Sequence, residues 1–107
     1  MSREIIIFVT APNSEEASRI ANALVSEQFA ACVNIVPSIE SIYRWEGKVT
    51  SDREALMIIK TTDDRYVDVE SRVKEMHTYS TPEIVAIPIV RGSQEYLDWL
   101  RKSTAIG

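Results

Sequence analysis

The single histidine of this 107-residue chain, His77, is followed closely by Tyr79 and Glu83. An imidazole, a phenol and a carboxylate can together transfer protons or bind a metal ion. One histidine cannot fill a zinc site, which takes three or four protein ligands, and the chain has no H-x₃-H, HExxH or CxxC spacing. A histidine in the last turn of a helix can also simply interact with the helix dipole. Three roles therefore stay open for His77: metal ligand, catalytic base or helix-terminal polar residue.

Two further reactive side chains, Cys32 and Lys60, lie in apolar stretches of the sequence. Cys32 follows two alanines, and a cysteine in such a setting usually behaves as a small buried hydrophobe, although a thiolate is also a soft metal ligand. Lys60 ends an apolar run, where it can pair with a carboxylate or, with Arg91, bind an anion. The chain has three glycines and no glycine-rich phosphate loop. No nucleophile or oxyanion feature is visible either, so we expect no enzyme.

The composition restricts the class of protein further. A net charge of −4 argues against nucleic-acid binding, which requires a basic surface. No run of about 18 apolar residues is long enough to span a membrane, and the N-terminal segment lacks a signal-peptide cleavage pattern. The length predicts a single domain over residues 1–107. With one cysteine and no internal disulfide, we expect a reduced, cytoplasmic location.

The hydrophobic pattern of the first half predicts two strands around a helix. Residues 5–9 form a short β-branched run that is typical of a strand buried on both faces. Asn13 and Glu16 have the spacing of a helix capping box, and apolar residues then recur at helical spacing to about residue 28. A second strand is expected over residues 30–36, ended by Pro37.

The second half predicts a long hairpin followed by a helix, a strand and a final helix. An extended segment over 39–45 and a strand over 49–60 flank a tight Glu46-Gly47-Lys48 turn. Thr62 and the two aspartates after it are expected to cap the next helix. The fourth strand, over 84–90, contains Pro88, which favours a sheet edge or a bulge. The last helix is expected to start at Gly92-Ser93.

The order β-α-β-β-α-β with a C-terminal helix predicts the α+β class and the ferredoxin-like, split βαβ plan. Two helices cover one face of such a sheet, so the other face needs a partner. A 12-residue hairpin arm is about 40 Å long, roughly twice a typical strand, and it carries Tyr43 and Trp45 beyond the domain. Long exposed edges invite strand pairing, so we expect a homo-oligomer, either dimer or trimer.

Several segments in this order resemble the CutA family, the divalent-cation tolerance proteins. The similarity extends over nearly the whole chain, and its most specific parts are the Y-x-W-E-G and H-x-Y-x-x-P-E patterns. The segments that carry it are Thr10-Ala11-Pro12, residues 30–35, residues 41–47, residues 58–62, residues 77–84 and residues 96–100.

The resemblance implies a homotrimer that acts in divalent-metal, chiefly copper, homeostasis and binds copper(II) weakly. In the family, copper binding is attributed to a histidine that matches His77, with a histidine where this chain has Met76 and a cysteine where it has Val9. A thioether can bind Cu(I), whereas valine cannot act as a ligand. The implied metal ligands are therefore His77 with Met76, and Cys32 if it reaches the same cavity.

We expect the binding cleft to contain Lys60, Tyr79 and Glu83, with Tyr43 and Trp45 on the hairpin. A second hypothesis is a signalling or binding module that holds a small anionic metabolite or a partner protein in clefts between subunits, with Lys60 and Arg91 facing the anion. A third, the least favoured, is an enzyme that uses His77, Tyr79 and Glu83.

Overall fold

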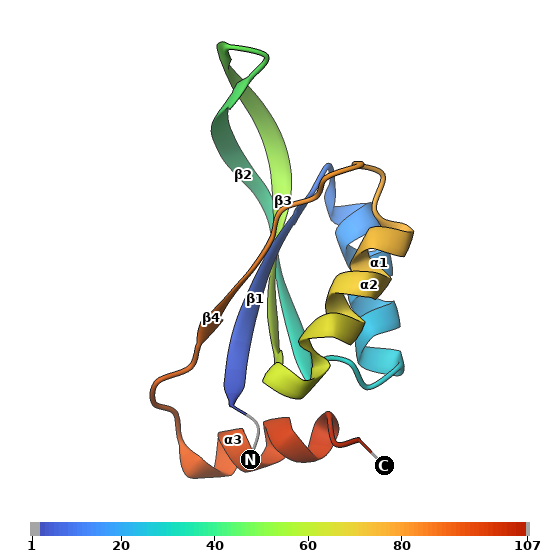
Figure 1. Cartoon of the computed structure of the whole chain (residues 1–107), viewed down its shortest axis with the longest axis vertical. Helices are drawn as coiled ribbons and strands as arrows, with labels where there is room; N and C mark the ends of the chain where they lie inside the picture. The colour runs from blue at the N-terminus through green and yellow to red at the C-terminus, as the bar shows by residue number, and fades with distance from the viewer. Residues whose placement is uncertain (1–2, 107) are drawn as a thin grey trace.

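The computed structural model describes residues 3–106, which form a four-stranded antiparallel sheet, three α-helices and one 3₁₀ turn. The element order confirms the predicted α+β, ferredoxin-like plan (Figure 1). The elements are β1 (Glu4–Ala11), α1 (Ser14–Ser26), β2 (Cys32–Trp45), β3 (Lys48–Thr62), the 3₁₀ turn (Asp63–Arg65), α2 (Tyr66–Met76), β4 (Ile84–Pro88) and α3 (Gln94–Ser103). Within the described residues, no helix is long and apolar enough to cross a membrane.

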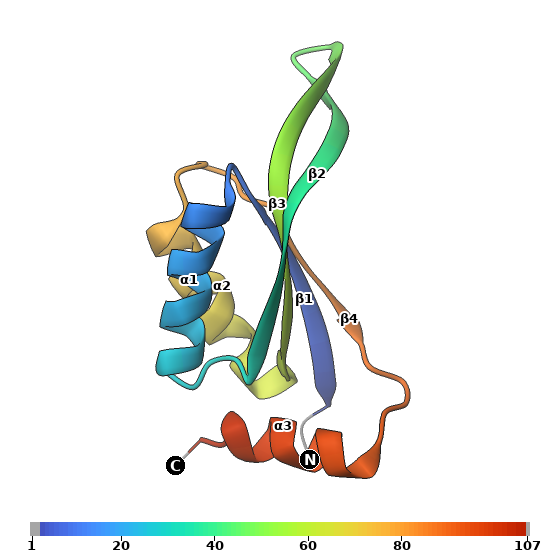
Figure 2. The ribbon, with the colours of Figure 1, turned by 180° about the vertical axis from the view of Figure 1, so that it is seen from behind.

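The sheet has the strand order β2-β3-β1-β4, and α1 and α2 lie on one of its faces (Figure 2). Alternate side chains of β1 and β3, including Ile7, Val9, Met57 and Ile59, are fully buried beneath these helices. The predicted strand over residues 5–9 is therefore confirmed, and β1 extends one residue before it and two beyond it. This strand lies in the centre of the sheet because it is apolar on both faces.

Helix α1 begins where the capping pattern predicts. The Asn13 side chain accepts a 2.8 Å hydrogen bond from the Glu16 amide, as an N-cap residue does. The Glu16 carboxylate lies elsewhere, against Thr78, so it satisfies donors outside the helix. The helix ends at Ser26, close to the predicted end, and Gln28 then adopts a left-handed φ of 64°.

The predicted cap of the second helix is wrong. Thr62 is the last residue of β3, and its side chain makes no capping hydrogen bond. Asp63–Arg65 form a 3₁₀ turn, and α2 starts only at Tyr66. The long pairing of β3 with β1 extends as far as Glu4 opposite Thr62, and this pairing outweighs the local capping preference.

The predicted end of the second strand at Pro37 is also wrong, because β2 continues through this residue to Trp45. The pairing with β3 shifts here: Val36 lies opposite Leu56, and Ile39 lies opposite Glu54. Two residues of β2 thus oppose one of β3, which defines a β-bulge. Proline has no amide hydrogen to donate to the ladder, and a bulge on an edge strand tolerates that loss.

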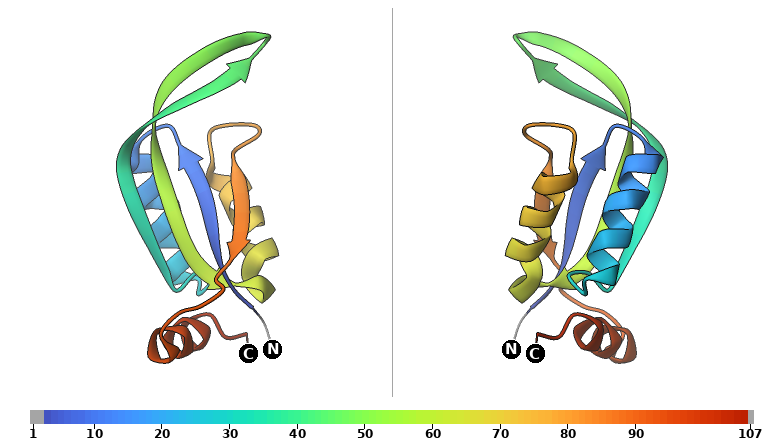
Figure 3. Two further views of the ribbon diagram at one scale, coloured as in Figure 1. Left: turned by 90° about the vertical axis from the view of Figure 1, so that its left-hand side faces the viewer. Right: turned by 90° about the vertical axis from the view of Figure 1, so that its right-hand side faces the viewer.

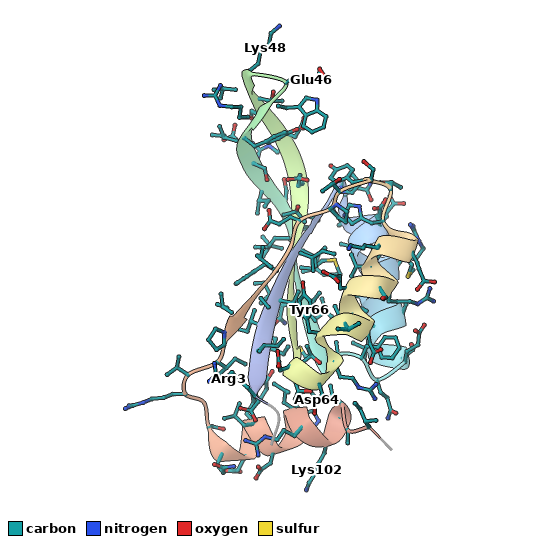
Figure 4. The ribbon with its side chains drawn as sticks, in the orientation of Figure 1. Arg3, Glu46, Lys48, Asp64, Tyr66 and Lys102 are labelled. Carbon is teal, nitrogen blue, oxygen red and sulfur yellow. The ribbon has the colours of Figure 1, made fainter. Side chains whose placement is uncertain are left out.

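The β2–β3 hairpin extends well beyond the rest of the molecule, as the sequence predicts. Its strands contain 14 and 15 residues, and the long axis of the molecule measures 44 Å. Glu46 and Gly47 form the turn with φ values of 49° and 76°, the left-handed conformation that a two-residue hairpin turn requires. Figure 3 shows the hairpin projecting past α1 and α2, and Figure 4 shows Glu46 and Lys48 at its tip.

The face of the sheet opposite α1 and α2 is apolar, and we call it the open face. Cross-strand pairing aligns its side chains in rows, and Val85 and Ile87 on β4 remain 50% and 47% exposed. The strand β4 is at the sheet edge, as Pro88 predicts, but it ends at this proline two residues before the expected end. Helix α3 crosses one end of the sheet (Figure 1). Lys60, opposite Ile6, lies on the same face. The apolar residues that β1, β3 and β4 contribute to the open face are Ile6, Phe8, Leu56, Ile58, Val85 and Ile87.

Candidate functional site

A groove of about 680 Å³ lies between the projecting hairpin and the loop that joins α2 to β4. The bulge at Pro37 helps to form it, because after the bulge the odd-numbered residues of β2 pair with the even-numbered residues of β3. Ser41 lies opposite Asp52 for this reason. We call this cavity the acid–tyrosine groove, and it is lined by Thr10, Ser41, Ile42, Tyr43, Trp45, Asp52, Glu54, Tyr79, Ser80, Thr81 and Glu83.

Two phenol–carboxylate pairs line the groove. The Tyr79 hydroxyl donates a 3.2 Å hydrogen bond to Glu54 Oε2, which joins the loop to the hairpin. Burial, followed by the charge of Glu54 and this hydrogen bond, raises the pKa of Tyr79 to about 12. The Tyr43 hydroxyl donates to Asp52 across the hairpin, and this hydrogen bond raises the pKa of Tyr43 above its ordinary value. Both phenols therefore stay protonated near neutral pH, where they are donors and not bases.

The charge of the groove is negative. Three of its lining residues, Asp52, Glu54 and Glu83, carry carboxylates, and none of the lining residues in the described chain is Lys or Arg. Serine, threonine and tyrosine hydroxyls, together with the apolar Ile42 and Trp45, complete the lining. Carboxylate and hydroxyl oxygens are suited to cations, and this electrostatic environment opposes an anion.

His77 lies beside the groove but is enclosed by protein. None of its side-chain surface is exposed. Its Nε2 atom lies 2.7 Å from the carbonyl oxygen of Thr10, and its Nδ1 atom accepts a 3.0 Å hydrogen bond from the Tyr79 amide. Glu16 Oε2 is 3.6 Å from Nδ1. The Glu16 carboxylate also accepts 3.1 Å hydrogen bonds from the amide and the hydroxyl of Thr78.

The structure brings together four of the residues that the sequence singles out: Tyr43, Trp45, Tyr79 and Glu83 line the groove, with Trp45 65% exposed. The implied metal ligands His77, Met76 and Cys32 are not among the residues that line the groove. Met76 packs against the hydrophobic core.

Cys32 and Lys60 lie opposite each other on β2 and β3, and they do not line the groove. Lys60 is four residues along β3 from Leu56, the partner of Thr10, which corresponds to about 13 Å. No group of three or more His, Cys, Asp or Glu side chains in residues 3–106 is close enough to hold a metal ion.

Sequence reasoning missed the acidic wall of the groove and the support of His77. Asp52 and Glu54 lie in the less apolar half of the predicted third strand, and their alternation was the available signal. It could not show what lies opposite them, because the pairing depends on the bulge at Pro37. Its spacing from Asn13 explains Glu16 as a capping residue, and no sequence signal connects it to Thr78, 62 residues later.

Comparison with known proteins gives a consistent result over nearly the whole chain. Residues 5–103 match the family model described as CutA1 divalent ion tolerance protein. The divalent-cation tolerance protein CutA of Thermus thermophilus is 52% identical over 101 residues, which cover 94% of this chain and 98% of that protein. The chloroplastic CutA of Arabidopsis thaliana is 51% identical over 100 residues, which cover 94% of this chain and 55% of the plant protein.

Comparison with solved structures also finds proteins of the CutA1 family. The crystal structure of CutA1 from Oryza sativa superposes with a TM-score of 0.94 at 48% identity, and the match covers 98% of this chain and 96% of that one. The chain thus spans about half the length of the Arabidopsis relative and nearly all of the Thermus protein.

Proposed function

This chain belongs to the CutA1 divalent ion tolerance family, and from that premise we propose that it binds divalent cations weakly, as a homotrimer, at the acid–tyrosine groove. The observation that carries the proposal is the lining of the groove, which has three carboxylates and two phenols and no basic side chain among its described residues. A cation is attracted to such a surface, whereas an anion is repelled.

Copper(II) is the cation that we propose first. Among divalent first-row metals it binds most tightly to a given set of nitrogen and oxygen ligands. The affinity is low because no three candidate ligands within the described residues converge on one point. His77, Met76 and Cys32 do not fit as a copper site in one subunit, since both ring nitrogens of His77 make hydrogen bonds, Met76 packs against the hydrophobic core and Cys32 lies on β2 opposite Lys60. We therefore assign the binding to Asp52 and Glu54 in the groove.

The open face supports the homotrimer. It presents apolar side chains of β1, β3 and β4. Figure 3 shows that α1 and α2 leave this side of the sheet uncovered. Burial of such a face stabilises association by about 25 cal/mol per Å² of apolar surface. The projecting hairpin adds strand edges that can pair with a neighbouring copy. The trimeric state itself rests on the family resemblance.

We propose a binding role without catalysis, in the cytoplasm. The two groove tyrosines are held in the protonated form, so neither supplies a base at neutral pH. The cytoplasmic assignment rests on the free thiol of Cys32, which a reducing compartment preserves.

A calorimetric titration with copper(II) tests the cation site. We expect saturable, weak binding to the wild-type protein, and a loss of at least about tenfold, or 1.4 kcal/mol, in the double variant Asp52→Asn, Glu54→Gln. The double variant Glu40→Gln, Glu46→Gln is the matched control, because it removes the same charge from the same hairpin outside the groove. Equal affinities in the two variants would refute the groove as the site.

Two additional arms separate the remaining alternatives. A melting temperature that rises with citrate or inorganic phosphate and not with copper would favour the anionic-metabolite module, because a ligand of the native state stabilises it by mass action.

Light scattering of the wild-type protein should give three times the monomer mass. Ile58→Asp, on the open face, should dissociate the trimer, whereas Val67→Asp, on the 68% exposed side chain of α2, should not.

A further inference from the structure

The hydrogen bonds of His77 determine which ring nitrogen carries the proton. A peptide carbonyl oxygen can only accept, so the 2.7 Å contact with Thr10 requires a hydrogen on Nε2. The Tyr79 amide can only donate, so the 3.0 Å contact requires a lone pair on Nδ1. His77 is therefore the neutral Nε2–H tautomer, and both ring nitrogens are already used within the protein.

The backbone around His77 is fixed from two other elements. Thr10 is on β1, at the end of the sheet next to the groove, and Glu16 is on the first turn of α1. Glu16 accepts hydrogen bonds from the amide and the hydroxyl of Thr78, and its side chain is 6% exposed. The three-residue segment 77–79 is thus tied to β1 by the imidazole and to α1 by the carboxylate.

These contacts determine the direction in which Tyr79 leaves the helix end. Its amide is held on Nδ1 of His77, its ring centroid is 4.8 Å from that of the imidazole, and its hydroxyl reaches Glu54 on the hairpin. A chain of contacts therefore runs from Thr10 through His77 and Tyr79 to the acidic wall of the groove. The loop residues Ser80, Thr81 and Glu83, which also line the groove, follow Tyr79 directly.

We infer that His77 is a positioning residue that holds Tyr79 and the groove loop in place, and that it does not bind the metal ion. The inference rests on the proposed function only in taking the groove as the cation site. A metal at Nδ1 would have to displace the Tyr79 amide, and it would have to reach a His77 side chain that has no exposed surface. A metal at Nε2 would have to displace both its proton and the Thr10 carbonyl.

The first test needs no variant. Copper(II) is added to wild-type protein in which histidine is labelled with ¹⁵N, and pulsed electron paramagnetic resonance detects imidazole nitrogen bound to the metal. We expect a copper signal with oxygen ligands and no imidazole coupling. Coupling to the His77 nitrogens would overturn the inference.

The second test uses no metal, so it separates this inference from the proposed function. Nuclear magnetic resonance of the labelled imidazole should show the Nε2–H tautomer, and a proton on Nδ1 instead would contradict the argument. In His77→Ala, Tyr79 should lose its contact with Glu54, and its pKa should therefore fall from about 12 towards the ordinary tyrosine value of 10.0. Tyr66, whose hydroxyl donates to Glu70 on α2, serves as the internal control and should not change.

Thr78→Val gives a milder form of the same perturbation if His77→Ala fails to fold. It removes the Thr78 hydroxyl, one of the two hydrogen-bond donors to Glu16, and leaves the imidazole intact. The pKa of Tyr79 should therefore fall as well, but by a smaller amount. An unchanged Tyr79 ionisation in a folded His77→Ala protein would refute the positioning role. Absence of any copper binding, together with the expected metal-free results, would refute the proposed cation site and leave the positioning role supported.

Discussion

Replacing Glu54 by glutamine is expected to make the Tyr79 phenol ionise at lower pH. Tyr79 donates a 3.2 Å hydrogen bond to Glu54, and the Glu54 charge is the second largest cause, after burial, of its raised pKa of about 12. Glutamine retains the shape and an accepting oxygen but removes the charge. The substitution therefore isolates the electrostatic contribution to the pairing of the groove walls.

The magnitude follows from the distance. Two unit charges 3.2 Å apart repel by about 1.3 kcal/mol even with the dielectric constant of bulk water. We use that value because Tyr79 is 39% exposed and solvent screens the pair. This energy corresponds to a factor of about ten in the ionisation constant, so the Glu54→Gln variant should release the Tyr79 proton about tenfold more readily.

The assay is an alkaline titration followed by nuclear magnetic resonance of tyrosine labelled at the ring carbon that bears the hydroxyl. Tyr79→Phe assigns the Tyr79 signal among the four tyrosines of the chain. Glu40→Gln is the matched control, because Glu40 accepts a 3.0 Å hydrogen bond from Ser51 on the same hairpin and does not line the groove. If Glu54→Gln and Glu40→Gln give the same titration curve for Tyr79, the hydrogen bond from Tyr79 to Glu54 does not form in solution and the groove walls are not paired as described.

Three further predictions concern stability at a fixed protein concentration. The pKa of Tyr79 is higher in the folded state, about 12 against an ordinary 10.0, so its contribution to the free energy of unfolding is fully present below pH 10 and is lost as pH rises from 10 to 12. The free energy of unfolding of Tyr79→Phe, measured in urea, should therefore fall less over that interval than that of the wild type. Ile59→Ala should cost about 2–5 kcal/mol because this side chain is fully buried in the core, whereas Val67→Ala on the exposed side of α2 should change the free energy of unfolding by less than about 0.5 kcal/mol. Arg101→Ala should leave the mostly buried Glu4 carboxylate without this ion pair and should speed hydrogen exchange in α3 more than in α1.

The sequence predicts most of the fold because the main elements are locally consistent. The apolar run over residues 5–9 becomes the central strand, and Ile20 and Leu24 of the helical stripe are fully buried. The Glu46-Gly47 pair forms the predicted turn. In each case the local preference and the burial pattern favour the same conformation, which is the condition under which single-sequence reasoning succeeds.

The two local errors have one physical cause. The local preference of Pro37 predicts the end of a strand, and that of Thr62 predicts a helix cap. In the structure both residues are in strands that pair with β3 or β1 over most of their length. Cross-strand pairing with a distant segment outweighs a local preference worth about 1 kcal/mol, and the sequence alone does not reveal which segment pairs.

The bulge at Pro37 illustrates why the site was harder to predict than the fold. Side chains on a strand alternate between faces, so a shift of one residue transfers every later side chain to the other face. Before the bulge, Asn34 and Val36 pair with Ile58 and Leu56 on the open face; after it, the odd-numbered residue Ser41 pairs with Asp52. The acid–tyrosine groove thus depends on an irregularity that no periodic pattern encodes.

The role of His77 depends on contacts that are equally remote from its sequence motif. The neighbouring residues do not show whether the imidazole binds a metal or supports a loop, because Tyr79 and Glu83 are compatible with either role. What distinguishes the two is whether a ring nitrogen retains a free lone pair. The Thr10 carbonyl, 67 residues earlier, requires the proton on Nε2, and the Tyr79 amide, two residues later, occupies Nδ1. A histidine at this place in the sequence can therefore serve as the support of Tyr79, which lines the acidic groove, with both of its ring nitrogens used within the protein.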